Sequence, residues 1–149
     1  MILAVFTFAN ACGGESGESG AEQIRTRLNT WRDQFNARNA DAVCDLFAPD
    51  LVDVFQGQPD RNFDQLCTFL RNSLNNPQLD FHYDLDIKDV FVSGGLGAVR
   101  LVWTLTVTHP DGSVADTSIE PGIDIFQRQP DKKWRIARFV SFSQTPVSP

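Results

Sequence analysis

The chain has 149 residues, enough for one domain with a sizeable buried core. Hydrophobic residues make up 42% of it, including twelve Phe and three Trp, which is an ordinary composition for a globular protein. The formal net charge of −6 excludes a surface dominated by Lys and Arg. We therefore expect no nucleic-acid partner and no binding to an anionic membrane through charge.

The first twenty residues differ in composition from the rest. A largely apolar run from Ile2 to Ala9 leads to Cys12, and a stretch rich in Gly, Ser and Glu follows. This pattern resembles the end of a bacterial lipoprotein signal peptide, which is cut before a cysteine that carries diacylglycerol. The resemblance implies a signal-like segment at 1–11, lipidation of Cys12, a flexible tether at 12–20 and export to a bacterial membrane surface. The alternative is an unstructured N-terminal extension of a cytoplasmic protein.

The other two cysteines form an even pair. Cys44 and Cys67 fall on two segments that we expect to be helical, and in an oxidising compartment they would join them through a disulfide. A bridge closing a loop of this size would contribute about 3 kcal/mol. The alternative is a pair of buried free thiols.

Two helices are predicted in the first third of the chain. An apolar stripe at helical spacing predicts the first, and consists of Ile24, Leu28, Trp31 and Phe35. Asn39 is a suitable N-cap for a short second helix, which Pro49 ends. We expect that helix to bury three apolar side chains, those of Val43, Leu46 and Phe47.

A short strand is expected at 51–55, before a third helix. Asn62 and Gln65 have the spacing of a capping box at the start of that helix. Its apolar face is expected to bury Leu66, Phe69, Leu70 and Leu74.

Four long strands are predicted after the helices. Alternation places the odd-numbered residues of 81–87 and 99–107 on one buried face. The third strand spans 114–127, where Pro121 and Gly122 predict a bulge or bend. In the last strand, alternation places three apolar side chains on one face, those of Trp134, Ile136 and Val140.

Three short segments of the sequence resemble motifs of one superfamily. They are Phe-Asn-Ala-Arg-Asn-Ala-Asp-Ala-Val at 35–43 leading to Leu-Phe-Ala-Pro-Asp at 46–50, Ile-Asp-Ile-Phe at 123–126, and Lys-Trp-Arg-Ile at 133–136. Their order and spacing resemble the SnoaL-like, nuclear-transport-factor-like group, which includes ketosteroid isomerases and polyketide cyclases. The resemblance implies an α+β domain at 21–144, followed by a disordered tail at 145–149. In that fold, three helices pack on a strongly curved antiparallel sheet and form a cone with a central pocket.

The resemblance also implies where catalytic groups would lie. Steroid isomerases use a carboxylate base, with a Tyr and a protonated Asp as hydrogen-bond donors to the oxyanion. The resemblance of these segments aligns the base position with Phe55, the tyrosine position with Trp31 and the aspartate position with Asp124. A Phe cannot accept a proton, so we do not expect that chemistry. Asp53, two residues earlier on the same strand face, is the alternative base.

Apolar and aromatic residues would line the expected pocket. Trp31, Tyr83 and Trp103 lie on the buried faces of a helix and two strands, where they would contact a ligand or fill a plain core. Asp124 would face the pocket with Phe55, or else face water while its isoleucine neighbours face the core. A pocketed Asp124 would have a raised pKa because burial disfavours its charge.

No metal or cofactor is expected. Three polar residues share one strand face, where they would meet a cation or more simply face solvent: His82, Asp84 and Asp86. On the central strand, the mixed polar face would suit a homodimer interface through the sheet; its residues are Arg100, Val102, Thr104 and Thr106.

These observations leave three hypotheses for function. The first is a lipid-tethered domain that binds a small apolar molecule. The second is an isomerase, cyclase or hydrolase of the same fold that uses Asp124 and Asp53. The third is a protein-interaction module whose pocket is filled by side chains.

Overall fold

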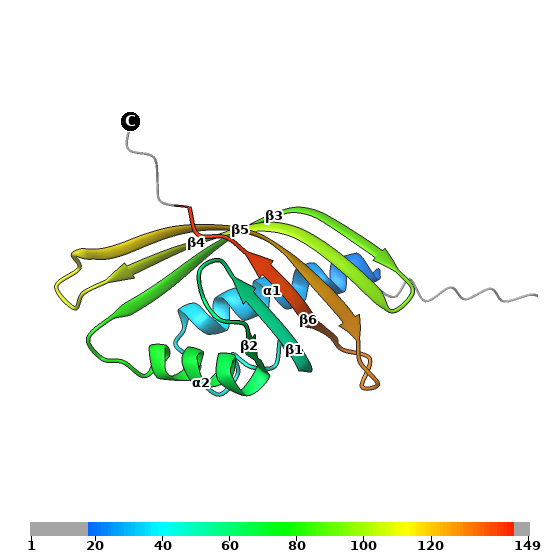
Figure 1. Cartoon of the computed structure of the whole chain (residues 1–149), viewed down its shortest axis with the longest axis horizontal. Coiled ribbons are helices and arrows are strands. Elements are labelled where there is room, and N and C mark those ends of the chain that lie inside the picture. Colours follow the sequence, from blue (N-terminus) through cyan, green and yellow to red (C-terminus); the bar gives the residue numbers. More distant parts are fainter. Residues whose placement is uncertain (1–17, 145–149) are drawn as a thin grey trace, which may run out of the picture.

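One mixed sheet and two helices form the domain (Figure 1). The computed structural model describes residues 18–144, so the signal-like segment, Cys12, most of the tether and the tail lie outside the described residues. The elements in chain order are α1 (Gly20–Asn36), β1 (Phe47–Phe55), β2 (Arg61–Asn62), α2 (Phe63–Leu74), β3 (Asp80–Ser93), β4 (Leu96–Thr108), β5 (Val114–Arg128) and β6 (Trp134–Ser141). The strands are ordered β2-β1-β6-β5-β4-β3 across the sheet.

The first helix, α1, begins at a capping box. The Ser19 side chain accepts a hydrogen bond from the Glu22 backbone, and the Glu22 side chain accepts one from the Ser19 backbone. The predicted apolar stripe is buried against the sheet, as Ile24, Leu28, Trp31 and Phe35. At the far end, the Asn36 side chain hydrogen-bonds both the N–H and the C=O of Tyr83, which fixes α1 against β3.

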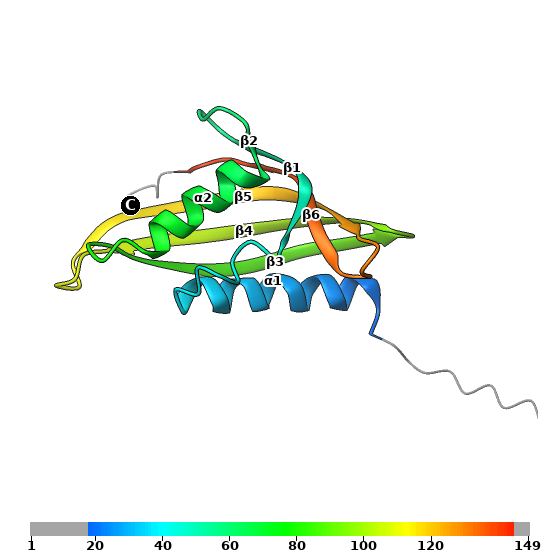
Figure 2. The same cartoon turned by 90° about the horizontal axis from the view of Figure 1, so that it is seen from below.

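Both helices cover the same face of the sheet (Figure 2). α1 runs along β3, and α2 lies nearer β1 and β2. In residues 81–87 of β3 and 99–107 of β4 the odd-numbered residues face the helices, as alternation predicted. A register shift after Ile87 reverses the alternation, so Val90 packs against the core and Phe91 is exposed. Neither helix of residues 18–144 is long and apolar enough to cross a membrane.

The expectation of a wholly antiparallel sheet is wrong at one pair. β1 runs parallel to β6, beginning where the Ile136 N–H donates to the Leu46 carbonyl. A tight hairpin after β5 makes β6 antiparallel to β5, and β6 then inserts between β5 and β1. The direction of β1 thus follows from a contact with the end of the chain, which no local pattern near β1 could indicate.

The second predicted helix is also wrong, because the structure describes turns between α1 and β1. Asn39 does cap one turn, since its Oδ1 accepts from the Ala42 N–H at 3.3 Å. Carbonyls that a helix would need are bound by side chains instead: Trp31 donates to Val43 and Arg71 donates to Ala40. Tertiary hydrogen bonds therefore replace helical ones in this short segment.

A disulfide joins this turn segment to α2. Cys44 and Cys67 are bonded, with 5.7 Å between their Cα atoms. The predicted capping box of Asn62 and Gln65 is present at the start of α2. Phe69 departs from the expected buried face: it is 53% exposed, and its ring lies beneath the Arg61 guanidinium, 4.8 Å from the ring centroid.

The irregularity expected at Pro121 and Gly122 is absent from the β4–β5 pairing, and the extra residue of β5 is Ala115 instead. The β5–β6 pairing also skips Ala137, so β6 carries an extra residue there. This residue reverses the alternation: Phe139 faces the helices, and Val140, expected inside, is 40% exposed on the other face.

Candidate functional site

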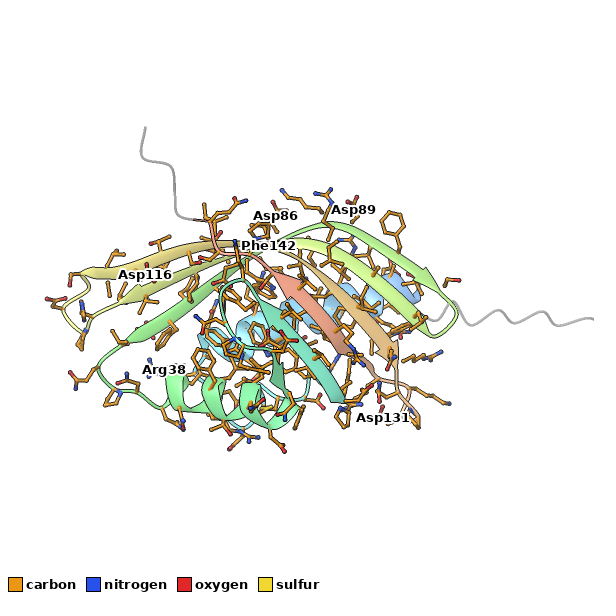
Figure 3. The ribbon with its side chains drawn as sticks, viewed as in Figure 1. Arg38, Asp86, Asp89, Asp116, Asp131 and Phe142 are labelled. Atoms are coloured by element: carbon orange, nitrogen blue, oxygen red, sulfur yellow. A yellow bond between two sulfur atoms is a disulfide. The ribbon has the colours of Figure 1, made fainter. Side chains whose placement is uncertain are left out.

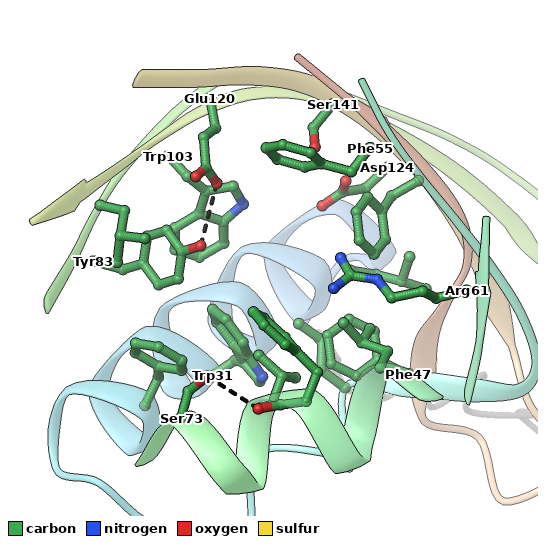
Figure 4. Close-up of a pocket in the computed structure, with 18 of the residues that line it drawn as sticks. Trp31, Phe47, Phe55, Arg61, Ser73, Tyr83, Trp103, Glu120, Asp124 and Ser141 are labelled. Carbon is green, nitrogen blue, oxygen red and sulfur yellow. Dashed lines mark hydrogen bonds between the residues drawn. The ribbon is translucent and has the colours of Figure 1, made fainter. Parts of the chain in front are cut away.

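A cavity of about 360 Å³ lies between the helices and the inner face of the sheet (Figure 4). Its wall is drawn from both helices and all six strands. Cross-strand register explains why these side chains converge, because residues paired across a sheet point to the same face. Trp103 pairs with Glu120, and Phe139 pairs with Asp124, so two aromatic rings lie beside two carboxyl groups.

Trp31 is the centre of an aromatic wall. Its ring centroid lies 5.2 Å from those of Phe35 and Trp103, and 5.9 Å from that of Tyr83. Its indole Nε1 donates to the Val43 carbonyl at 2.7 Å, so the buried polar atom is satisfied. The hydrogen bond and the neighbouring rings fix this side of the cavity as a rigid, flat apolar surface.

Glu120 and Tyr83 form a hydrogen-bonded pair in the wall. The Tyr83 hydroxyl donates to Oε2 of Glu120 at 3.2 Å. Burial raises the pKa of Glu120, and burial together with the nearby Glu120 carboxylate raises the pKa of Tyr83 well above its usual value. The tyrosine therefore keeps its proton and remains a hydrogen-bond donor at neutral pH.

Asp124 is a buried carboxyl group without a polar partner in the described residues. It is 5% exposed, and none of the residues in 18–144 gives it an ion pair or a hydrogen bond that would stabilise its charge. Burial raises its pKa to about 7. Asp124 therefore changes its protonation state near neutral pH, and its carboxyl group points into the cavity (Figure 4).

Arg61 is the cation of the cavity wall, and it is already paired. Its Nε donates to Oδ2 of Asp53 at 2.6 Å, across the β1–β2 pairing. Asp53 is fully buried, and its Oδ1 has no hydrogen-bond partner. Burial raises the pKa of Asp53, while Arg61 opposes that rise. Because Asp53 lies behind Arg61 and outside the cavity lining, its clearest role is to hold the guanidinium in place.

The sequence matches the family model of the SnoaL-like domain over residues 28–137. The chain belongs to the SnoaL-like family. No curated protein matches the sequence of this SnoaL-like chain.

Solved structures share the fold at low sequence identity. A conserved protein from Planctomyces limnophilus has a TM-score of 0.71 and 14% identity, over 82% of this chain and 94% of that one. A ketosteroid isomerase-like protein from Erwinia carotovora atroseptica has a TM-score of 0.69 and 20% identity, over 89% and 100%. A nuclear transport factor 2-like superfamily protein from Salmonella enterica has a TM-score of 0.69 and 15% identity, over 86% and 93%.

Most of the residues selected from the sequence of this SnoaL-like domain meet in the cavity. Those that line it are Trp31, Phe55, Tyr83, Trp103 and Asp124. Asp53 is the exception, since it is buried behind Arg61. His82, Asp84 and Asp86 are exposed on the opposite face of β3, and no group of three metal-binding side chains converges anywhere in residues 18–144.

Sequence reasoning missed two polar residues of the site. Glu120 lies four residues before Asp124 and therefore on the same strand face, a signal hidden by interpreting Pro121 and Gly122 as an interruption. Arg61 lies on a two-residue strand whose position depends on the pairing with Asp53. No periodicity in so short a segment indicates that pairing.

Proposed function

We propose that this SnoaL-like domain binds a small, mainly apolar ligand in the cavity. The observation that carries the proposal is the open space of about 360 Å³ behind an aromatic wall with few polar groups. Protein interiors are normally packed without such spaces, and ligand sites typically measure about 300–1,000 Å³. The same observation argues against the alternative of an interaction module whose pocket is filled by side chains.

Catalysis by Asp124 is the second candidate. A carboxyl group with a pKa of about 7 can give or take a proton at neutral pH, which suits a general acid or base. Asp53 is not suited to act as the partner base of Asp124, because Asp53 is fully buried and bound to Arg61. Phe55, at the position of the base in steroid isomerases, cannot transfer a proton. Binding is therefore the function that the site supports best.

Titration with N-phenyl-1-naphthylamine, a neutral apolar fluorophore, tests the proposal. Its fluorescence should rise on binding, while emission from Trp31 and Trp103 falls by energy transfer, because both rings line the cavity. The variant Leu105→Trp places a larger side chain in the cavity and should weaken binding about tenfold or more.

The matched control lies at the adjacent residue of β4. Thr104→Trp adds a side chain of the same size on the opposite face of the strand and should leave the affinity unchanged. Equal affinities in the two variants, or no binding to the unmodified protein, would contradict the proposal.

We propose further that Cys12 attaches the domain to a bacterial membrane through a lipid. The apolar run before Cys12 supports this, and so does the Cys44–Cys67 disulfide, since disulfides persist mainly in oxidising compartments. Expressed in bacteria with labelled palmitate, the chain should incorporate the label, and Cys12→Ser should not. A soluble, unlabelled product that keeps residues 1–11 would contradict the proposal.

A further inference from the structure

The cavity has an excess of buried carboxyl groups. Its titratable lining residues are Arg61, Tyr83, Glu120 and Asp124. The charge of Arg61 is matched by Asp53. Neither Glu120 nor Asp124 forms an ion pair with a side chain of residues 18–144. The charge of Arg61 partly opposes the raised pKa of Glu120, whereas no cation of the described chain opposes that of Asp124.

Asp124 indicates where a ligand cation would bind. Its side chain is almost fully buried, faces the cavity and has no partner in the described chain (Figure 4). A buried carboxylate is costly unless a cation or several donors accompany it. Glu120 lies on the same face of β5, four residues away, and already accepts one hydrogen bond from Tyr83. Four residues span about 13 Å along a strand, so Glu120 is a separate acceptor farther along the cavity wall.

The aromatic wall suits the same kind of group. Phe139 is the cross-strand neighbour of Asp124, and Trp103 is that of Glu120. The face of an aromatic ring attracts a cation, and the attraction strengthens where water is excluded. Rings beside two carboxyls are thus a suitable environment for an alkylammonium group attached to an apolar body.

We propose that the ligand of this cavity is a hydrophobic amine, whose protonated nitrogen binds at Asp124 while its apolar part lies against Trp31. This inference rests on the proposed ligand-binding function and names the chemical class of the ligand. Arg61 does not give the cavity a preference for anionic ligands, because its Nε is bound to Asp53. A ligand carboxylate would also meet the carboxyl groups of Glu120 and Asp124.

A matched set of three compounds tests the chemical class. 1-Naphthylmethylamine, 1-naphthalenemethanol and 1-naphthoic acid share one apolar ring system and differ in charge, and each can displace N-phenyl-1-naphthylamine from the protein. At about pH 8 we expect the amine to bind about tenfold more tightly than the alcohol, which is about 1.4 kcal/mol, and the acid to bind most weakly.

Variants locate the effect on β5. Asp124→Asn should abolish the preference for the amine over the alcohol, and Glu120→Gln should change it much less. Asp84→Asn changes an exposed carboxyl on the outer face of β3 and should leave the preference intact. If the alcohol matches the amine in the unmodified protein, or if the acid binds best, the amine inference is wrong while the proposed function stands. If neither the fluorophore nor any of the three compounds binds, both are wrong.

The pH profile of the unmodified protein tests the inference without any variant. The charged and titratable groups of the cavity wall around Asp124 are Arg61 on β2, Tyr83 on β3 and Glu120 on β5, with Asp53 of β1 behind Arg61. β4 and β6 present uncharged side chains there. Asp124 loses its proton between about pH 6 and about pH 8, so amine affinity should rise several-fold over this range and alcohol affinity should not. An amine affinity that is flat or falls with pH would overturn the inference.

Discussion

Asp124 is held in the cavity by its neighbours on both sides of β5. It pairs with Val99 of β4 and Phe139 of β6, and neither side chain can donate a hydrogen bond to it. Burial without compensation is the cause of the raised pKa, about 7 instead of 3.8. The same residue therefore offers a binding group to a ligand and destabilises the empty protein when it is ionised.

Replacing Asp124 by Asn should change how stability depends on pH. Between pH 3.8 and about 7 the folded protein holds a proton on Asp124 that the unfolded chain has released, so raising the pH across this window lowers the free energy of unfolding. Above about pH 7 the loss is complete. The Asn variant lacks this loss, and its advantage should grow with pH toward an upper limit of roughly 4 kcal/mol.

Urea unfolding of both proteins at a series of pH values measures this difference. Asp53 and Glu120 also have raised pKa values, but they are present in both proteins and cancel in the comparison. A stability difference that does not vary with pH would show that Asp124 titrates normally.

At the scale of elements, the turn segment between α1 and β1 depends on contacts with distant parts of the chain. The disulfide ties it to α2, and the Trp31 indole binds its Val43 carbonyl. Asp45 within it forms ion pairs with Arg27 of α1 and Arg135 of β6. This segment also brings Leu46 to the cavity wall, so its stability affects the shape of the site.

Removing the disulfide should therefore destabilise the domain. Cys44→Ala combined with Cys67→Ala should lower the free energy of unfolding by about 3 kcal/mol, because the bond closes a loop between residues 23 positions apart. Urea unfolding in a Cys12→Ser background measures the effect, and reductant should destabilise the parent protein by a similar amount. Resistance of the parent to reductant and to both substitutions would contradict this expectation.

Sequence patterns were sufficient for elements with long, regular repeats. The stripe of α1, the capping box at Asn62 and the alternation at 81–87 in β3 and 99–107 in β4 each follow from local spacing, and the structure confirms them. Prediction failed where distant contacts decide. The parallel direction of β1, the turns after Asn39 and the extra residue at Ala137 all depend on partners elsewhere in the chain.

The same distinction between local patterns and distant contacts applies to the residues of the candidate site. Trp31 was found because it belongs to the regular apolar stripe of α1, and Asp124 because it lies on a regular strand in a segment that resembles the family. Phe139 was not selected, because the bulge at Ala137 reverses the alternation on which the prediction for the last strand rested. Arg61 reaches the cavity through a pairing only two residues long. A single extra residue in one strand thus exchanged an expected inner side chain, Val140, for an aromatic ring of the cavity.

At the scale of the whole molecule, the sheet separates two different surfaces. The helices and the cavity lie on one side, and Asp86, Asp89 and Phe142 are on the other (Figure 3). Three apolar side chains in the last two strands and just after them are substantially exposed, at 51% for Ile123, 40% for Val140 and 49% for Phe142. Exposed apolar side chains beside one another often mark an interface.

Homodimerisation through this outer face remains a prediction. If it occurs, the mass in solution at micromolar concentration should be that of a dimer, and Ile123→Lys should halve it, because a charge on each copy would be buried in the interface. Size-exclusion chromatography with light scattering measures both. A monomeric mass for the unmodified protein would contradict the prediction and would leave the cavity and its ligand unaffected.

The indole N–H signals of the three tryptophans test most directly the central claim, that a ligand enters the cavity. Trp31 and Trp103 line it, whereas Trp134 is buried elsewhere and donates to Gln23. In ¹H–¹⁵N spectra recorded during titration with N-phenyl-1-naphthylamine, the Trp31 and Trp103 signals should shift together while the Trp134 signal stays in place. Binding that moves the Trp134 signal as much as the other two, or that moves none of the three, would contradict the claim.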